Sequence, residues 1–457
     1  MKLTEHVRRS LTAQRAPRVP GDRGALLAQL RREVERIQRR PPRVAPPPEM
    51  PPLPRALADL PMPEAWDPEG QHFRHDHPPG HRYGGARLER PGAELLPQVA
   101  RLLARFAEPE PRNTSPLRVE DLLFLDLETT GLSRSAETVA FLIGTGRWPA
   151  GEQGFQVNQL FLRDPADEAL ALDRLQELLD GARVIVTFNG RGFDLPLLRN
   201  RALLTRTFID LDKPHLDLLP LCRRLFRPRL TNCRLTTLER ELLGFERRGD
   251  VEGSEAPRIY AEWLRTGRPG ELPLIIEHNR LDVALMAPLL ERVTRHLLDP
   301  LQWAEDGEEL LGSALLHLGA GEAGLAEACL HRGLELARLP ATRRALLSAL
   351  ARHLRRTGRI HDAGARWEQL RREFPDHDTG YIELAKYHEH VTKDLGRALD
   401  LVERSPFQHR EETQHRLRRL RRRVQRALKG SGKAVEEGER LASALEVRPA
   451  DPDHRHQ

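Results

Sequence analysis

Short apolar runs alternate with amphipathic helical patterns along the central part of the chain. Three runs of strand length come first, followed by a helical pattern, a fourth buried strand and another helix. These predicted elements are Leu122–Leu127, Thr138–Arg147, Phe155–Leu162, Ala166–Asp180, Arg183–Phe188 and Leu195–Leu204. The order β-β-β-α-β-α, with largely helical sequence as far as His296, predicts a mixed sheet covered by helices.

After Pro300 the sequence keeps only helical periods and is rich in Leu, Ala and Arg. Leu350-Ala351 and Leu384-Ala385 lie 34 residues apart, which is the tetratricopeptide period, and small residues let paired helices approach closely. An irregular helical bundle is the alternative. Either way, we predict an all-helical domain over residues 305–429 and a polar tail over residues 430–457 that frays.

The N-terminal part of the chain is basic and then rich in proline. Residues 1–40 have a helical pattern around Ala25–Arg40, and the proline-dense residues 41–63 predict an extended linker. We expect residues 1–70 to be largely disordered. The histidines that follow match no common metal-ligand spacing, so a polar turn is the favoured interpretation of this stretch. They are His72, His75, His77 and His81.

Composition narrows the class of protein. A chain of 457 residues is too long for one core, so we predict a catalytic domain over residues 71–300, with its core at 117–297, beside the helical domain. No stretch approaches the ~20 apolar residues of a membrane helix, and no apolar segment of a secretory signal follows the N-terminus. Three scattered cysteines suit a reducing, cytoplasmic environment. The net charge of +6 is too modest to identify a nucleic-acid partner by itself.

Two carboxylates stand at the end of the first apolar strand. Strand alternation puts Asp126 and Glu128 on one face, together with Phe124, and apolar neighbours predict that the strand is covered on both faces. Two carboxylates on a buried face lose hydration and repel each other, so a divalent metal ion is the simplest partner. The alternative is that one of them caps the turn after Thr129 and the other reaches solvent.

Two further acidic residues stand on predicted helices. Asp194 opens a helix in TFNGRGFDLPLL, where an N-cap role is as compatible with its position as a ligand role. In EHNRLDVALMAPLLERV, His278 and Asp282 lie four residues apart on one helical face. Asp282 lies within about 60° of Leu285 around the helix, so it points toward the covered side, where a carboxylate needs a cation or several donors. A surface His–Asp pair is the alternative.

The segments DLETTGL, FNG..FD and HNRLD, in this order, resemble the three exonuclease motifs of the DnaQ-like DEDD superfamily, and most of all its YprB-type ribonuclease-H-like branch. The segments HLDLLPLCRRLF, CRLTTLERELLGFER and DVEGSEAPRIYAEWL strengthen the resemblance. It covers roughly Asp121–Val293 and, more faintly, Gln71–Gly85. It implies an α/β ribonuclease-H-like fold joined to the helical domain.

Carried over residue by residue, the resemblance implies metal ligands at Asp126, Glu128, Asp194 and Asp282. It implies a general base at His278. Members that use histidine usually place it five residues before the last aspartate, whereas here the offset is four, the spacing of tyrosine-using members. On a helix, an offset of four still brings the imidazole near the carboxylate.

The function implied by the resemblance is a metal-dependent 3′–5′ exonuclease that hydrolyses phosphodiester bonds at the 3′ ends of single-stranded DNA or RNA. Two Mg²⁺ or Mn²⁺ ions about 4 Å apart would hold the attacking water and the leaving oxygen, because hard cations prefer oxygen ligands. Asp126 would bridge both ions, Glu128 and Asp282 would bind one of them, and Asp194 would act partly through water. His278 would accept the proton of the water near neutral pH.

Several residues near the motifs are candidates for contact with nucleic acid. They are Thr129, Asn189, Arg191, Asn279, Arg223 and Arg224. Asn189 and Asn279 have a second interpretation, which is to orient a ligand, and Asp217 is predicted to cap a helix. For the basic residues near Arg223 and for the run Arg416–Arg426, a solvated face is the alternative to phosphate binding.

A function of a different class competes with the enzyme. A catalytically weak or inactive nuclease-fold protein would act as a scaffold that binds protein or nucleic acid through its helical repeats. Four intact carboxylates aimed at one spot favour the enzyme, because a scaffold does not need them.

Overall fold

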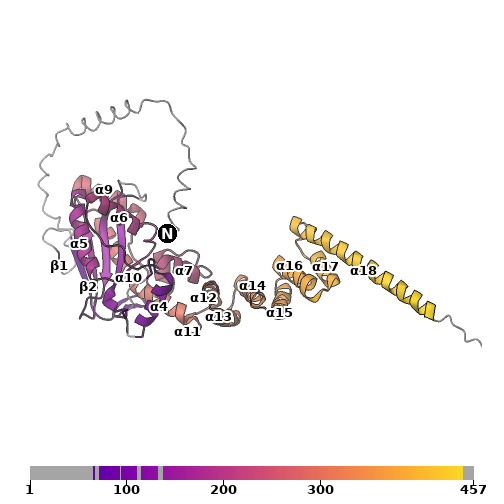
Figure 1. Cartoon of the computed structure of the whole chain (residues 1–457). Helices are drawn as coiled ribbons and strands as arrows, with labels where there is room; N and C mark the ends of the chain where they lie inside the picture. The colour runs from indigo at the N-terminus through magenta and orange to yellow at the C-terminus, as the bar shows by residue number, and fades with distance from the viewer. Residues whose placement is uncertain (1–64, 67–71, 93, 111–114, 132–136, 446–457) are drawn as a thin grey trace, which may run out of the picture. The chain divides into compact units, whose positions relative to one another are not determined.

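The computed structural model describes residues 65–66, 72–92, 94–110, 115–131 and 137–445 (Figure 1). Only the backbone is described at residues 65–66 and 429–445. The helix predicted around Ala25–Arg40 and the proline-rich linker lie outside these residues. Among the described residues, no helix has both the length and the apolar character that crossing a lipid bilayer requires.

A mixed seven-stranded sheet forms the centre of the described N-terminal part. Its spatial order is β1-β2-β7-β6-β5-β8-β9, in which β5 pairs parallel with β8, β8 pairs parallel with β9, and all other neighbours are antiparallel. The strands are β1 (Ala65–Trp66), β2 (His72–His77), β5 (Leu122–Thr129), β6 (Ala140–Arg147), β7 (Phe155–Phe161), β8 (Val184–Thr187) and β9 (His215–Asp217). A separate hairpin is formed by β3 (His81–Tyr83) and β4 (Ala86–Leu88).

Helices cover both faces of this sheet, as the sequence predicted. They are α4 (Leu96–Phe106), α5 (Glu168–Asp180), α6 (Asp194–Thr205), α7 (Leu218–Phe226), α8 (Leu235–Leu243), α9 (Ala256–Thr266), α10 (Leu272–Leu298) and α11 (Pro300–Trp303). The predicted mixed sheet with flanking helices is therefore confirmed.

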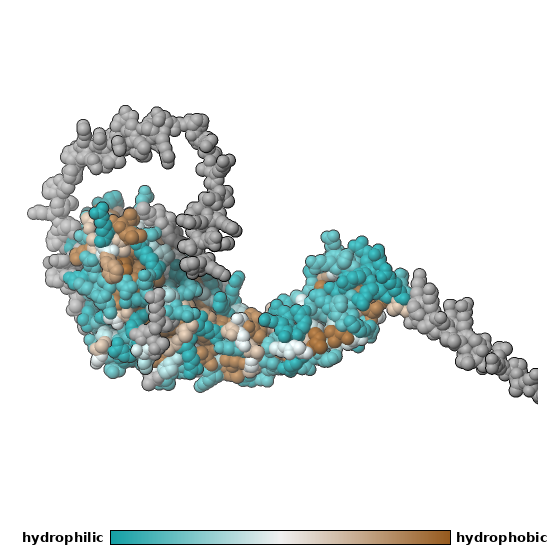
Figure 2. All heavy atoms as spheres, viewed as in Figure 1, coloured by the Kyte–Doolittle hydropathy of each residue, from teal (hydrophilic) through white to brown (hydrophobic). Residues whose placement is uncertain are grey.

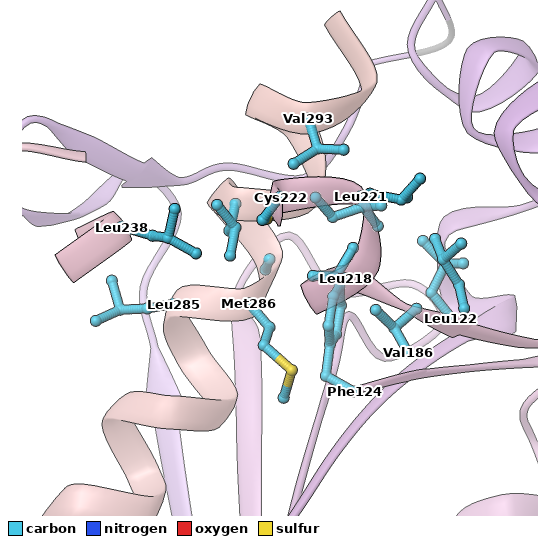
Figure 3. Close-up of a cluster of buried hydrophobic side chains, with 14 of the residues drawn as sticks. Leu122, Phe124, Val186, Leu218, Leu221, Cys222, Leu238, Leu285, Met286 and Val293 are labelled. Carbon is cyan, nitrogen blue, oxygen red and sulfur yellow. The ribbon is translucent and has the colours of Figure 1, made fainter. Parts of the chain in front are cut away.

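Strand β5 separates two hydrophobic cores, because its successive side chains point to opposite faces. Leu123 and Leu125 pack with leucines of α5 and α6. Leu122 and Phe124 pack with α7, α8 and α10, in the cluster drawn in Figure 3. Asp126 and Glu128 continue the second series, so both carboxylates emerge on the α10 face at the carboxyl end of β5.

The histidine-bearing stretch was mispredicted. The stretch from His72 to His77, interpreted as a polar turn, is strand β2 and pairs along its whole length with β7. Its polar residues have polar partners across the ladder: His72 Nε2 lies 3.0 Å from Asn158 Oδ1, and Gln156 donates to Asp76 Oδ1 at 3.0 Å. A strand that is rich in polar residues lacks the apolar alternation by which strands are recognised.

The C-terminal part is all-helical, as predicted, and has its own hydrophobic core. Its helices are α12 (Gly307–Gly319), α13 (Ala323–Leu336), α14 (Pro340–Arg356), α15 (Ile360–Glu373), α16 (Asp378–Tyr387), α17 (Leu395–Glu403) and α18 (Glu411–Leu445), with a π-helical turn at His388–Thr392. The starts of α12, α14 and α16 are 33 and 38 residues apart. Ala351 and Ala385 are both fully buried. The tetratricopeptide assignment remains a prediction.

Helix α18 runs past Gly430, at which the sequence analysis placed the start of a polar tail, and ends at Leu445. Residues 433–445 are mostly Lys, Ala, Glu, Arg and Leu, which are strong helix formers, and this explains why the helix continues.

The helical part contacts the sheet-containing part through α12 and α7. Gly312 permits this contact, because a Cβ there would lie 2.1 Å from the carbonyl oxygen of Leu225. Beside it, Arg229 donates to the buried carboxylate of Glu309 at 2.5 Å. Gly312 therefore lets α12 approach α7 closely, and the ion pair of Arg229 with Glu309 stabilises this contact.

Two glycines of β6 let α10 lie close to the sheet. Gly144 is the cross-strand partner of Asp126. A Cβ at Gly144 would lie 2.3 Å from Asn279 Oδ1 and 2.8 Å from Val283 Cγ2, and one at Gly146 would lie 2.6 Å from Val283 Cγ1. Larger residues at these positions would push α10 away from β5.

We therefore expect Gly144→Ala to destabilise the protein by about 1–3 kcal/mol, the typical cost of overpacking a closed core. Asn279 is short and held by hydrogen bonds, and Val283 is rigid, so neither side chain can swing away. Urea unfolding followed by circular dichroism measures the change. Gly324→Ala is the control, because a Cβ there meets nothing within 4 Å. Equal stability of Gly144→Ala and the unmodified protein would contradict this account of α10 packing.

Candidate active site

Asp126 and Glu128 lie near the carboxyl end of β5. The register between β5 and β6 shifts there, between Glu128 and Thr129. Glu128 is buried and Asp126 keeps partial access to solvent. Asn279 of α10 donates to Asp126 Oδ2 at 2.9 Å and accepts from Gln159 of β7 at 2.8 Å. This amide spans the space above Gly144 and fixes the orientation of the Asp126 carboxylate.

Asp194 reaches the same region from the first residue of α6. The strand before it, β8, runs parallel to β5, so the carboxyl ends of both strands share one edge of the sheet. Asp194 is buried, and the helix begins with Phe193 as its N-cap without a side-chain capping bond. A Cβ at Gly190 would lie 2.8 Å from Asp194 Oδ2, so the preceding turn passes very close to this carboxylate. Asp194 therefore does not act as the helix cap that was its alternative interpretation.

His278 and Asp282 come from successive turns of α10. The imidazole Nε2 of His278 lies 3.6 Å from Asp282 Oδ2. Their side chains are only 11% and 16% exposed, so the pair is not the surface contact that was the alternative interpretation. The four-residue offset thus places the imidazole beside the carboxylate.

Asp126, Glu128 and Asp194 converge closely enough on Asp282 for its charge to affect their protonation. Burial raises the pKa of Asp126 well above its usual range, and the neighbouring charges of Asp282, Asp194 and Glu128 raise it further. Burial and the charges of Asp282 and Asp194 likewise raise the pKa of Glu128. Burial and the charges of Asp217 and Asp282 raise the pKa of Asp194 to about 7. Such crowding favours a bound cation.

Arg247 supplies one positive charge to this cluster. Its side chain is 4% exposed and lies in the loop after α8. Its guanidinium donates to Glu239 through Nε at 2.7 Å and Nη2 at 2.5 Å, and Nη2 also contacts Asp282 Oδ1. Glu239 is fully buried, so it holds the guanidinium in one orientation against Asp282.

Asp250, in the same loop, orients His278. Its Oδ1 lies 2.7 Å from His278 Nδ1, whereas Arg247 Nη1 lies 3.3 Å from the same nitrogen. The two contacts require opposite roles of Nδ1, and the shorter one to a carboxylate is the stronger. Nδ1 therefore carries the hydrogen and donates it to Asp250, which leaves Nε2 facing Asp282 as an acceptor.

The donor set fits a hard divalent cation, because it consists of carboxylate oxygens with no sulfur ligand. Within the described residues, however, no group of three or more His, Cys, Asp or Glu side chains has atoms placed for metal coordination. The contact of Arg247 with Asp282 and that of Asn279 with Asp126 each engage one carboxylate oxygen. The residues are therefore gathered at one place, and their individual ligand roles remain a prediction.

The candidate nucleic-acid contacts differ in accessibility. Asn279 is fully buried between Asp126 and Gln159, and this geometry suits the second interpretation, in which it orients the carboxylate. Its contact with nucleic acid remains a prediction. Thr129 is buried and its hydroxyl donates to the carbonyl of Gly131 at 2.8 Å. Asn189 is exposed in the turn before α6, with a left-handed φ of 72°.

The basic candidates lie on the surface. Arg191 is exposed and pairs with Glu108 at 3.2 Å. Arg223 and Arg224 are exposed at the end of α7 and make no ion pair with any residue that the structure describes. Their contact with nucleic acid remains a prediction.

Asp217 is a structural residue, as predicted. Its Oδ1 accepts from the backbone of Leu219 at 3.0 Å, which caps α7, and from that of Asn189 at 2.8 Å. It therefore holds the turn that delivers Asp194.

Sequence reasoning missed Arg247, Glu239, Asp250 and Gln159. The segments CRLTTLERELLGFER and DVEGSEAPRIYAEWL were noticed only as likeness to a family, although they contain or flank three of these residues. In the sequence, Arg247 and Asp250 stand in a polar, glycine-containing stretch that is typical of a solvated loop. Only the fold brings this stretch to α10.

Comparison with known proteins agrees with this geometry. A model of the RNase_H superfamily matches residues 123–294. The uncharacterized protein YprB of Bacillus subtilis (strain 168) is 30% identical over 290 residues, which cover 62% of this chain and 69% of that protein.

Among solved structures, the family B DNA polymerase from the hyperthermophilic archaeon Pyrobaculum calidifontis is similar, with 17% identity and a TM-score of 0.30. That match covers 42% of this chain and 28% of the polymerase, so this chain spans well under two thirds of the polymerase and the likeness carries no conclusion about activity.

Arg247→Met is expected to destabilise the protein by about 3–5 kcal/mol, because it leaves the buried carboxylate of Glu239 unpaired next to Asp282. Adding Glu239→Gln should recover part of the loss. Arg248→Met is the matched control, since Arg248 is the exposed neighbour and its removal should change stability by less than about 0.5 kcal/mol. Chemical denaturation measures all three. Equal effects of Arg247→Met and Arg248→Met would show that the Arg247 contacts contribute nothing.

Without metal, the stability that Asp194 contributes should fall as pH rises from 5.5 to 8. The pKa of Asp194 is raised to about 7 in the folded protein, above its unfolded value, so its contribution is fully present below the unfolded pKa and is lost as pH rises through about 7. The melting temperature in EDTA is the measurement, and the unmodified protein should lose stability relative to Asp194→Asn over this interval. A difference between the two proteins that does not change with pH would contradict the expected proton uptake.

Proposed function

The chain belongs to the YprB family of the ribonuclease H superfamily, and from that membership we propose that it is a metal-dependent 3′–5′ exonuclease acting on single-stranded nucleic acid. The observation that supports this most strongly is the convergence of carboxylates from three separate segments at one edge of the sheet. Each of Asp126, Glu128 and Asp194 has a raised pKa that the charge of Asp282 helps to raise.

Asp126, Glu128, Asp194 and Asp282 would hold the metal. Bound Mg²⁺ or Mn²⁺ supplies the positive charge that stabilises a hydrolytic attack on a phosphodiester and lowers the pKa of a water molecule. Asn279 keeps Asp126 in one orientation, and Arg247 does the same for Asp282. These contacts preorganise the carboxylates before any substrate arrives.

In this proposal His278 moves the proton. Asp250 accepts the Nδ1 hydrogen at 2.7 Å, so the basic lone pair is on Nε2, on the side of Asp282. A water molecule held at the carboxylates would lie within reach of that nitrogen, which would take its proton as the water attacks phosphorus.

Direction and substrate rest on the resemblance of DLETTGL, FNG..FD and HNRLD to exonuclease motifs. The exposed side chains of Asn189, Arg223 and Arg224 provide polar and cationic groups for a strand that enters the site. Arginine suits phosphate because its guanidinium donates two parallel hydrogen bonds.

A second candidate function is a nuclease-fold scaffold with little or no turnover. The contact of Arg247 with Asp282 favours it, because a guanidinium that holds a ligand oxygen competes with a metal ion for that oxygen. A protein partner bound through the helical part belongs to this candidate.

Incubation with 5′-labelled DNA and RNA oligomers in Mn²⁺, Mg²⁺ or EDTA separates the two functions. The nuclease proposal expects a ladder that shortens from the 3′ end and disappears in EDTA. Oligomers that stay intact in both metals, while still being bound, would favour the scaffold.

Asp126→Asn and Asp282→Asn are each expected to lower the rate of turnover by a factor of about 10³ or more, with little loss of fold. A loss of this order is typical when an essential electrostatic group is removed from an active site. Each change removes a negative charge on which metal binding depends. Asp173→Asn is the control, because Asp173 is exposed on α5 away from the cluster, and it should keep full activity. Full nuclease activity in Asp126→Asn would eliminate the proposed site.

A further inference from the structure

Helix α18 begins with an unusually dense arginine segment. Seven of the eleven residues from Arg416 to Arg426 are arginine, and the surface over α16–α18 is mainly hydrophilic (Figure 2). The structure sorts these arginines into three groups according to the side of the helix on which they lie. Within the described part of the chain, only the third group lacks an ion-pair partner.

The first two groups are part of the fold. Arg416, Arg419 and Arg423 converge on Glu389, which is 1% exposed, at 3.3, 2.6 and 2.6 Å. On the opposite flank, Arg421 pairs with Glu403 at 2.9 Å. These contacts fasten α18 to the π-helical turn and to α17.

The third group points away from the fold. Arg418, Arg422 and Arg426 are exposed and make no ion pair with any side chain in the described part of the chain. At 100° per residue they occupy an arc of about 80°, opposite the buried Leu417 and Leu420, and they span about 12 Å along the helix.

This arrangement has an electrostatic cost if the face contacts only solvent. Like charges four residues apart on a helix repel each other, and here this happens twice in succession. The helix also retains excess charge, because Glu389 and Glu403 offset only two of the seven arginines. A polyanion with regularly spaced charges would relieve this repulsion.

We propose that the outward stripe formed by Arg418, Arg422 and Arg426 binds the phosphate backbone of a nucleic-acid strand, at a place separate from the carboxylate cluster. The choice of nucleic acid over other polyanions rests on the proposed function. From Glu411 to Leu428 the helix has no Phe, Tyr or Trp on which a base would stack, so the stripe recognises phosphates irrespective of base sequence.

The test is fluorescence anisotropy of a labelled 20-mer DNA or RNA with the full-length protein in EDTA, over a range of salt concentrations. The triple variant Arg418→Gln, Arg422→Gln, Arg426→Gln should bind about 10- to 100-fold more weakly at low salt. The slope of log affinity against log salt should become shallower by about 2, since each lost phosphate contact contributes about 0.7 for a single strand. Lysine at all three positions should restore most of the affinity.

A control variant removes the same charge from the same helical part. Arg332→Gln, Arg355→Gln and Arg359→Gln replace arginines that are 48–50% exposed but paired with Glu335, Glu383 and Glu327. This variant should bind like the unmodified protein. Unchanged binding by the stripe variant, or an equal loss in both variants, would overturn the proposal. Competition of the 20-mer by an acidic peptide or anionic vesicles at equal charge concentration would overturn its assignment to nucleic acid.

The stripe and the carboxylate cluster are tested separately. The stripe variant should hydrolyse a trinucleotide at the rate of the unmodified protein, because the stripe contributes no residue to the carboxylate cluster. Binding through the stripe without any cleavage would support this inference and contradict the nuclease proposal. Cleavage of oligomers together with binding that does not depend on the stripe would contradict this inference and support the nuclease proposal.

Discussion

Carboxylates that are pressed together in a poorly hydrated place repel one another, and the architecture of this protein is organised around that repulsion. Asp126, Glu128, Asp194 and Asp282 arrive from β5, α6 and α10, and burial acts with their mutual charge to raise the pKa values of the first three. The polypeptide relieves only part of this cost. Arg247 provides a single guanidinium and Asn279 a single amide, so the cluster still has more negative charge than the protein offsets. A site built in this way favours cations.

The convergence depends on how closely one helix approaches one strand. Helix α10 carries Asn279 and Asp282, and it reaches Asp126 because residue 144, directly across the ladder, has no side chain. The parallel pairing of β5 with β8 then brings the start of α6 to the same edge, where Asp217 anchors the turn before Asp194 by accepting its backbone N–H groups. Sheet register, a glycine and a capping residue are therefore as necessary to the site as its acids.

The same principle of partly compensated charge appears at the far end of the chain with the opposite sign. Arg416, Arg419 and Arg423 share the buried carboxylate of Glu389, while the stripe on the outside of α18 has no such partner among the residues that the structure describes. The fold thus presents concentrated negative charge at the sheet edge and concentrated positive charge on a helix. At the carboxylate cluster, a polyanionic substrate would need the positive charge of bound metal. At the stripe, the arginine side chains would supply the positive charge.

The sequence by itself determined the local elements and the identity of the acids. Periodicity located β5, β6, β7 and β8 within about two residues, and alternation placed Asp126 and Glu128 on one covered face, because these signals depend only on neighbours in the chain. Strand β2 escaped notice because it is largely polar, and residues such as His72 and Asp76 find polar partners on β7, a strand some eighty residues away. The roles of Arg247, Glu239 and Asp250 were also invisible. Only the tertiary structure decides which distant charge a buried arginine meets, because electrostatic partners are chosen by proximity in space and leave no period in the sequence.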